Sequence, residues 1–189
     1  MTTNPYAPPT AAVADVPANG VSLPSGSGAV PPFFAVSVSK LAVLSLCSFG
    51  VYEIYWFYKN WQLIRARERS NIYPFTRAFC AVLFCYQCFA RMRDYGTELG
   101  IAPPPAAGAL AAGWIITTIA YKLPDPYWLV SLLAVVFLLP VQAHVNRINQ
   151  ASVPNHEPNA RFSGWNWVLA IAGACLLILA IIGTLMPEK

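Results

Sequence analysis

A single acid lies within a long apolar and aromatic segment of this sequence. Residues 41–58 contain one charged residue, Glu53. Acids inside membrane segments are costly and commonly serve a proton, an ion or a substrate. The residues three and four positions away on a helix are Phe49, Gly50, Trp56 and Phe57, so a basic partner has to come from another helix. The sequence therefore predicts either a structural acid, paired or snorkelling, or a proton or ion site. The candidate bases are Arg77, Arg91, Arg93, His144 and Arg147.

Three cysteines have the spacing of an iron–sulfur motif but lie in an unsuitable segment. Cys80, Cys85 and Cys88 form C-x4-C-x2-C, the spacing of three ligands in plant-type ferredoxins. The residues between them are largely apolar and favour a helix, and on a helix Cys80 lies well off the face shared by the other two. We predict that these thiols are small packing residues, with no metal and no disulfide framework.

Several polar residues lie together at the end of the apolar stretch 126–146. His144 and Arg147 are one helical turn apart, with Gln142, Asn146 and Asn149 nearby. The simplest interpretation is a hydrated helix end. The candidate functional polar residues are thus Glu53, Arg77, His144 and Arg147.

The catalytic arrangements of common enzymes are missing from the pattern. The sequence has no phosphate-binding loop, no triad spacing and no paired acids, and its two histidines do not predict a metal site. We therefore expect a protein that is not an enzyme and needs no cofactor.

Composition indicates that lipid surrounds most of the chain. Of the 189 residues, 57% are hydrophobic and 11% are charged, whereas soluble domains have about 25% charged residues. The stretches 99–121, 126–146 and 162–187 contain no Lys, Arg, Asp or Glu and are long enough to cross a hydrocarbon core about 30 Å thick. The net charge of +4 comes from bases that flank apolar segments, which is typical of membrane proteins rather than of nucleic-acid binding. No cleavable signal peptide is expected.

The pattern predicts an all-α membrane domain over residues 33–189, preceded by a tail. Residues 1–32 are rich in Pro, Ala, Gly and Ser, and we expect them to be disordered. One helix is expected from residue 36 or 41 to 58, continuing to about 70 as an interfacial helix. A second begins at Pro74 and has only 13 uncharged residues, 78–90. Three more are expected at about 106–121, 127–149 (with a kink at Pro140) and 164–186.

Three topologies are compatible with the charges. Five spans divide the twelve Lys and Arg almost evenly, whereas four spans and a shallow second helix separate them better and put the tail outside. A re-entrant first helix, turning at Ser48-Phe49-Gly50, puts the tail inside and leaves only Lys122 and Lys189 on the other side. We favour four spans and keep the re-entrant alternative, since residues 41–58 are long enough to span.

Aromatic residues predict where one membrane surface lies. Tyr and Trp collect where acyl chains meet headgroups because their rings are apolar with one polar atom. We expect such a belt around the end of the first helix, formed by Tyr52, Tyr55, Trp56, Tyr58 and Trp61.

The region around Glu53 resembles a family of small bacterial membrane proteins of unknown function. Its recurrent signature, K-x-x-x-L-S-x-x-[ST]-F-G-x-Y-x-x-Y-W-F-Y-K-x-W, is similar to residues 40–61, from Lys40 to Trp61. The stretches at 73–79, 122–133 and 139–142 look like later blocks of the same family. The resemblance implies a multi-pass protein of the bacterial inner membrane and no catalytic activity.

The sequence thus predicts a transmembrane helical bundle with a non-enzymatic role. We expect a scaffold or accessory subunit surrounded by membrane lipids, with a protein partner or a second copy of the chain and no nucleic acid. The alternative is a small transporter or proton-linked membrane protein that uses Glu53.

Overall fold

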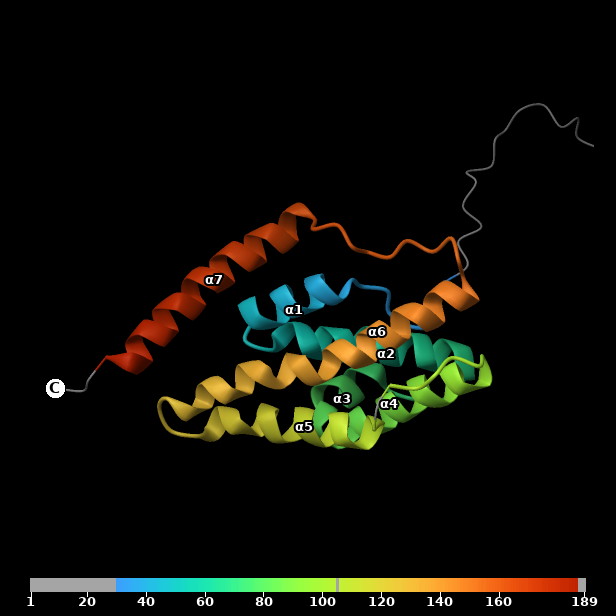
Figure 1. The fold of residues 1–189 in the computed structure, drawn as a ribbon, viewed down its shortest axis with the longest axis horizontal. Helices are drawn as coiled ribbons and strands as arrows, with labels where there is room; N and C mark the ends of the chain where they lie inside the picture. Colours follow the sequence, from blue (N-terminus) through green and yellow to red (C-terminus); the bar gives the residue numbers. More distant parts are fainter. Residues whose placement is uncertain (1–29, 105, 187–189) are drawn as a thin grey trace, which may run out of the picture.

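The protein is all-helical over the residues that the computed structural model describes, 30–104 and 106–186 (Figure 1). The predicted tail, except for residues 30–32, lies outside them. The elements are α1 (Val38–Cys47), α2 (Val51–Glu68), α3 (Pro74–Phe79), α4 (Ala81–Glu98), α5 (Ala107–Ile119), the 3-10 turns η1 (Ala120–Lys122) and η2 (Tyr127–Leu133), α6 (Ala134–Ser152) and α7 (Gly164–Leu185).

The first predicted helix is a hairpin of two helices, so the expectation of one continuous helix is wrong. The backbone N–H groups of Ser48 and Gly50 donate to Leu44 and Ser45 at the end of α1. Phe49 and Gly50 then have φ values of 52° and 84°, in the left-handed region. This conformation reverses the chain, and α2 returns alongside α1 (Figure 1). The position of the turn matches the re-entrant alternative.

The second predicted helix is also divided. Pro74 occupies the first turn of α3, as predicted. Cys80 interrupts the helix, and α3 packs against α2 while α4 runs on to the end where α2 stops (Figure 1). The short uncharged stretch therefore belongs to a second hairpin.

The later helices follow the sequence pattern more closely. α5 and α6 lie side by side, joined by the turns η1 and η2, and Pro140 lies inside α6. Two stretches are long and apolar enough to cross a membrane, Tyr127–Ser152 and Gly164–Thr184. α7 contacts α1 and leaves most of its apolar side chains exposed. These features weakly support membrane association.

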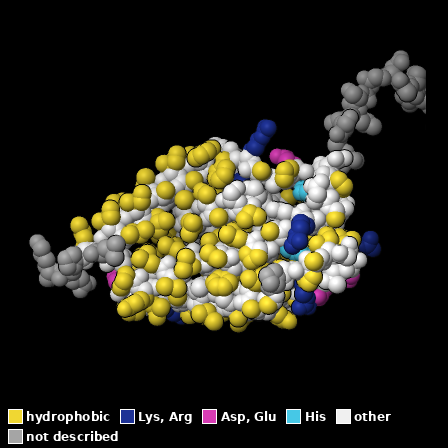
Figure 2. Space-filling view, in the orientation of Figure 1, with side chains coloured by type: hydrophobic (Ala, Val, Ile, Leu, Met, Phe, Trp, Pro, Cys, Tyr) yellow, Lys and Arg dark blue, Asp and Glu magenta, His cyan; other side chains and the backbone are white. Residues whose placement is uncertain are grey.

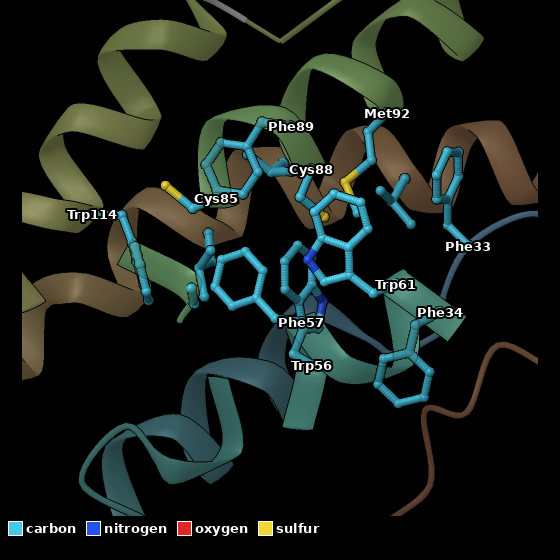
Figure 3. Packing of buried hydrophobic residues seen from close by; sticks show 14 of the residues in the cluster. Phe33, Phe34, Trp56, Phe57, Trp61, Cys85, Cys88, Phe89, Met92 and Trp114 are labelled. Atoms are coloured by element: carbon cyan, nitrogen blue, oxygen red, sulfur yellow. The ribbon is translucent and has the colours of Figure 1, made fainter. Parts of the chain in front are cut away.

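An aromatic core joins α2, α4 and α5 (Figure 3). Phe57 packs with its ring centroid 5.0 Å from Trp56, 6.1 Å from Phe89 and 4.9 Å from Trp114. Trp56 and Trp61 are fully buried, so placing these two rings in an interfacial belt was wrong. Tyr55 is exposed, and Tyr52 and Tyr58 are half-buried. The core excludes the two indoles from a membrane surface.

Cysteines fill gaps in the same core. Cys85 and Cys88 are fully buried among its aromatic rings (Figure 3), which confirms the prediction that they pack as small apolar residues. All five cysteines of the chain are free thiols.

Charges and apolar side chains separate along the molecule. On the face seen in Figure 2, Lys and Arg gather toward the end where α2, α4 and α6 stop, while hydrophobic side chains cover α7 and the opposite end. We call the first end the basic end. Among the described residues, Lys122 is the one Lys or Arg in the turn joining α5 to α6. The surface is therefore more basic at one end and more apolar at the other.

Candidate functional site

An extended segment, residues 31–37, runs into the core ahead of α1. We call it the strap. Pro31 and Pro32 begin it, and proline favours extended over helical backbone in the residues around it. Phe33 to Val36 are buried, so their backbone N–H and C=O groups need partners inside the protein.

Side-chain amides supply these partners. Asn149 accepts from the N–H of Phe33 (3.2 Å) and donates to its C=O (3.0 Å). Asn60 accepts from the N–H of Phe34 at 3.0 Å. Asn146 donates to Val36 and Asn159 donates to Ala35. We call this set, with Gln142, the amide clamp: Asn60, Gln142, Asn146, Asn149 and Asn159.

Gln142 lies at the centre of the clamp. Its Nε2 donates to the C=O groups of Phe34 (3.2 Å) and Val36 (3.1 Å). Its Oε1 accepts from Nε1 of Trp56 at 2.6 Å. One fully buried side chain on α6 thus connects the strap to α2.

Arg67 holds the strap where it enters the protein. Its guanidinium donates to the C=O of Pro32 at 3.2 Å and lies 4.5 Å and 4.4 Å from the ring centroids of Phe33 and Tyr95. Burial lowers the pKa of Arg67, and the charge of Glu68 opposes this shift. The strap is therefore fixed at the basic end by a cation held between two rings.

Lys40 ties α1 to the loop before α7. It is only 3% exposed, and its Nζ donates to Oδ1 of Asn159 (2.9 Å) and to the C=O of Arg161 (2.8 Å). Asn159 thus serves both the strap and α1. The loop before α7 therefore contacts both the strap and α1.

Glu53 lies in a different part of the protein. It is 5% exposed, and its Oε2 accepts from Nε1 of Trp114 at 2.6 Å. No base lies within ion-pair distance of it among the described residues. Of the alternatives predicted for Glu53, the ion pair with a base from another helix is therefore not formed within the described residues.

A cavity of about 430 Å³ adjoins Glu53. It lies between the tip of the α1–α2 hairpin, the α3–α4 junction, α5 and η2. Ser45 and Thr118 line it, and their buried hydroxyl oxygens have no hydrogen-bond partner within the described chain. Its remaining walls are mainly apolar, with aromatic residues from several elements: Phe49, Phe79, Trp114, Tyr121 and Trp128.

The other predicted polar residues do not join Glu53. Arg77 lies 4.7 Å from the centroid of the Trp61 ring and 5.0 Å from that of Phe84, with a hydrogen bond to Gln87. Burial lowers the pKa of Arg77. It supports the core beside α3 and α4.

His144 and Arg147 have separate surroundings on α6. His144 is fully buried, and a Cβ at Gly96 would lie 2.5 Å from its Nε2. Neither ring nitrogen has a partner in the described part of the chain. Arg147 is exposed. The interpretation of this group as a hydrated helix end is wrong for His144, Gln142 and Asn149, which are fully buried.

Sequence reasoning missed the clamp. The signal was present in the three amides Gln142, Asn146 and Asn149, which recur at helical spacing near the end of an apolar helix. Without the hairpin of α1 and α2, nothing indicated that an extended segment would lie against them.

Comparisons with known proteins leave this geometry as the basis for function. No protein-family model, no curated protein and no solved structure matches the chain. The resemblance of residues 40–61 to a membrane-protein family stays a prediction.

Proposed function

We propose that the protein is a non-enzymatic scaffold of the bacterial inner membrane that displays its N-terminal tail on the cytoplasmic face. The proposal rests on the amide clamp. Five side-chain amides and Arg67 fix the strap at the basic end, so the tail has a defined point of exit.

The proposed topology follows from the charge separation. The chain crosses the bilayer with α5, with η2 and α6 together, and with α7. The α1–α2 and α3–α4 hairpins enter from the basic end and return to it. The positive-inside rule then puts the basic end in the cytoplasm. This arrangement replaces the favoured four-span model by the re-entrant alternative.

The hydrogen bonds of the amide clamp support a structural role. The buried amides of the clamp are satisfied by the protein's own backbone, so they are used for structure and not held open for a substrate. A tail rich in proline loses little entropy when it binds a partner. The partner we propose is a protein at the cytoplasmic face.

Crosslinking in cells tests this function. A photo-crosslinking amino acid at Tyr6 of the tail is expected to give one discrete adduct with another protein. The same amino acid at Ile178, which is 57% exposed on α7, is the control for lipid-facing positions and should give none. Absence of a discrete adduct from Tyr6 would contradict the scaffold proposal.

A second candidate function is small-molecule or proton-linked transport. The observation that favours it is the buried carboxylate of Glu53 beside a cavity with two hydroxyls that lack partners. Loss of cellular function in Glu53→Gln, at a normal level of folded protein, would favour this role over the scaffold.

A further inference from the structure

The Glu53 cavity has the features of a binding site and not of a packing defect. Empty cavities in proteins are usually apolar, and buried polar groups normally have partners. Ser45 is 2% exposed, lines the cavity and has no partner for its hydroxyl among the described residues. Thr118 on α5 is half-buried, lines the same cavity, and its hydroxyl oxygen also has no partner among the described residues. Two hydroxyls without partners, on residues that line one cavity, indicate a polar group that the described chain does not itself supply.

The carboxylate of Glu53 limits the charge of that group. Oε2 accepts the indole hydrogen bond of Trp114, while Oε1 accepts none from the described residues. A buried carboxylate with a free oxygen and no basic neighbour favours a cation or a neutral donor and disfavours an anion. The ligand should therefore donate hydrogen bonds.

The walls decide between an inorganic and an organic cation. Calcium and magnesium take six or more oxygen ligands, whereas Glu53 is the one carboxylate lining this cavity. Aromatic rings, by contrast, attract organic cations through their faces. Trp114, Tyr121 and Trp128 lie around the same hollow, so the walls fit an organic ammonium group.

The hydroxyls distinguish a primary from a quaternary ammonium. Ser45 and Thr118 can each accept a hydrogen bond from an N–H, and a primary ammonium has three such donors. A quaternary ammonium has none and would leave both oxygens without partners. Exposed apolar side chains at the rim, Val51 and Phe79, leave a path for an alkyl chain toward the lipid.

We infer that the Glu53 cavity binds the primary ammonium group of an amphiphile, with Glu53, Ser45 and Thr118 as its hydrogen-bond acceptors. The ammonium can come from an amino-phospholipid headgroup or from a free lipophilic amine. This site is separate from the amide clamp and does not depend on the scaffold function.

Calorimetric titration of the full chain in mild detergent tests the site, with octylammonium as the probe. Octylammonium is expected to bind saturably at one site, and octanol and octyltrimethylammonium at least tenfold more weakly. Glu53→Gln should lower the affinity for octylammonium at least tenfold. Glu98→Gln, an exposed acid at the end of α4, is the matched control and should leave it unchanged.

Ser45→Ala is the second variant, because it retains Glu53 and the Trp114 hydrogen bond. It should weaken octylammonium several-fold and leave octyltrimethylammonium unaffected. No saturable binding, equal binding of octanol, or full affinity in both Glu53→Gln and Ser45→Ala would overturn the inference.

Nanodiscs identify the source of the ammonium. If phosphatidylethanolamine is the ligand, discs that contain it should compete with octylammonium and discs of phosphatidylcholine should not. Equal affinity in both kinds of disc, with the Glu53→Gln effect preserved, assigns the site to a free amine.

Discussion

Nε1 of Trp56 donates a 2.6 Å hydrogen bond to Oε1 of Gln142, across 86 positions of sequence. This contact joins α2 to α6 at the point where Gln142 also holds the strap. One side-chain amide, that of Gln142 on α6, therefore joins α2 and the strap to α6.

Replacing Gln142 by leucine should destabilise the protein more than a surface change. The Gln142→Leu variant leaves the indole N–H of Trp56 and the C=O of Phe34 buried without a partner, whereas the C=O of Val36 keeps the hydrogen bond from Asn146. Each orphaned group costs about 1–3 kcal/mol, so we expect a loss of roughly 3 kcal/mol or more in the free energy of unfolding. Unfolding by SDS from mixed micelles measures it.

Gln150→Leu is the control for this change. Gln150 is exposed on the same helix, and its replacement should change stability by less than about 0.5 kcal/mol. Equal effects of the two variants would show that the clamp does not stabilise the fold.

Arg67 should control how firmly the strap is held. Its guanidinium lies between two rings and donates to Pro32, and lysine keeps the charge but not the planar stacking. We expect Arg67→Lys to speed hydrogen exchange of the Phe33 and Phe34 amides. Arg65→Lys, at an exposed site, should leave both rates unchanged, and a similar acceleration in both variants would contradict the assigned role.

Gly173 should set how close α7 comes to α1. A Cβ at Gly173 would clash with the backbone oxygen of Cys47, whereas one at Gly183 meets nothing within 4 Å. Overpacking of this kind costs about 1–3 kcal/mol. Gly173→Ala should therefore lower the thermal stability in detergent and Gly183→Ala should not; a stable Gly173→Ala variant would mean that α7 does not pack here.

Replacing Glu53 by leucine should lower the stability of the fold more than replacing it by glutamine. Glutamine retains an oxygen for the indole of Trp114, while leucine leaves that buried N–H unpaired. We expect Glu53→Leu to lose about 1–3 kcal/mol in the free energy of unfolding and Glu53→Gln to lose less. The same SDS titration compares them, and equal losses would contradict the hydrogen bond as the stabilising contact.

Some of the fold could be predicted because local signals determine it. Pro74 marks the start of α3, and a long apolar run marks α7. The break at Phe49 and Gly50 was one of the topologies that the sequence left open, because the residues on both sides are apolar whether the chain continues or reverses.

The surroundings of the candidate functional residues also could not be predicted, because they depend on contacts between distant parts of the sequence. Trp56 and Trp61 have the composition of an interfacial belt, yet their burial depends on packing against α4, which no local pattern encodes. Glu53 was predictable as an unusual acid, but its partner Trp114 lies 61 positions away. The amides of the clamp acquire a role only once the strap is placed beside them.

Cysteine labelling of intact and inverted membrane vesicles tests the proposed topology most directly. Single cysteines at Val30, Asp125 and Glu157, in an otherwise cysteine-free full chain, report the tail exit, the turn between α5 and α6, and the loop before α7. The account predicts that Val30 and Glu157 are labelled from the cytoplasmic face and Asp125 from the opposite face. Labelling of Val30 from the face opposite to Glu157 would show that the first hairpin does not return to its own side, and would contradict the account.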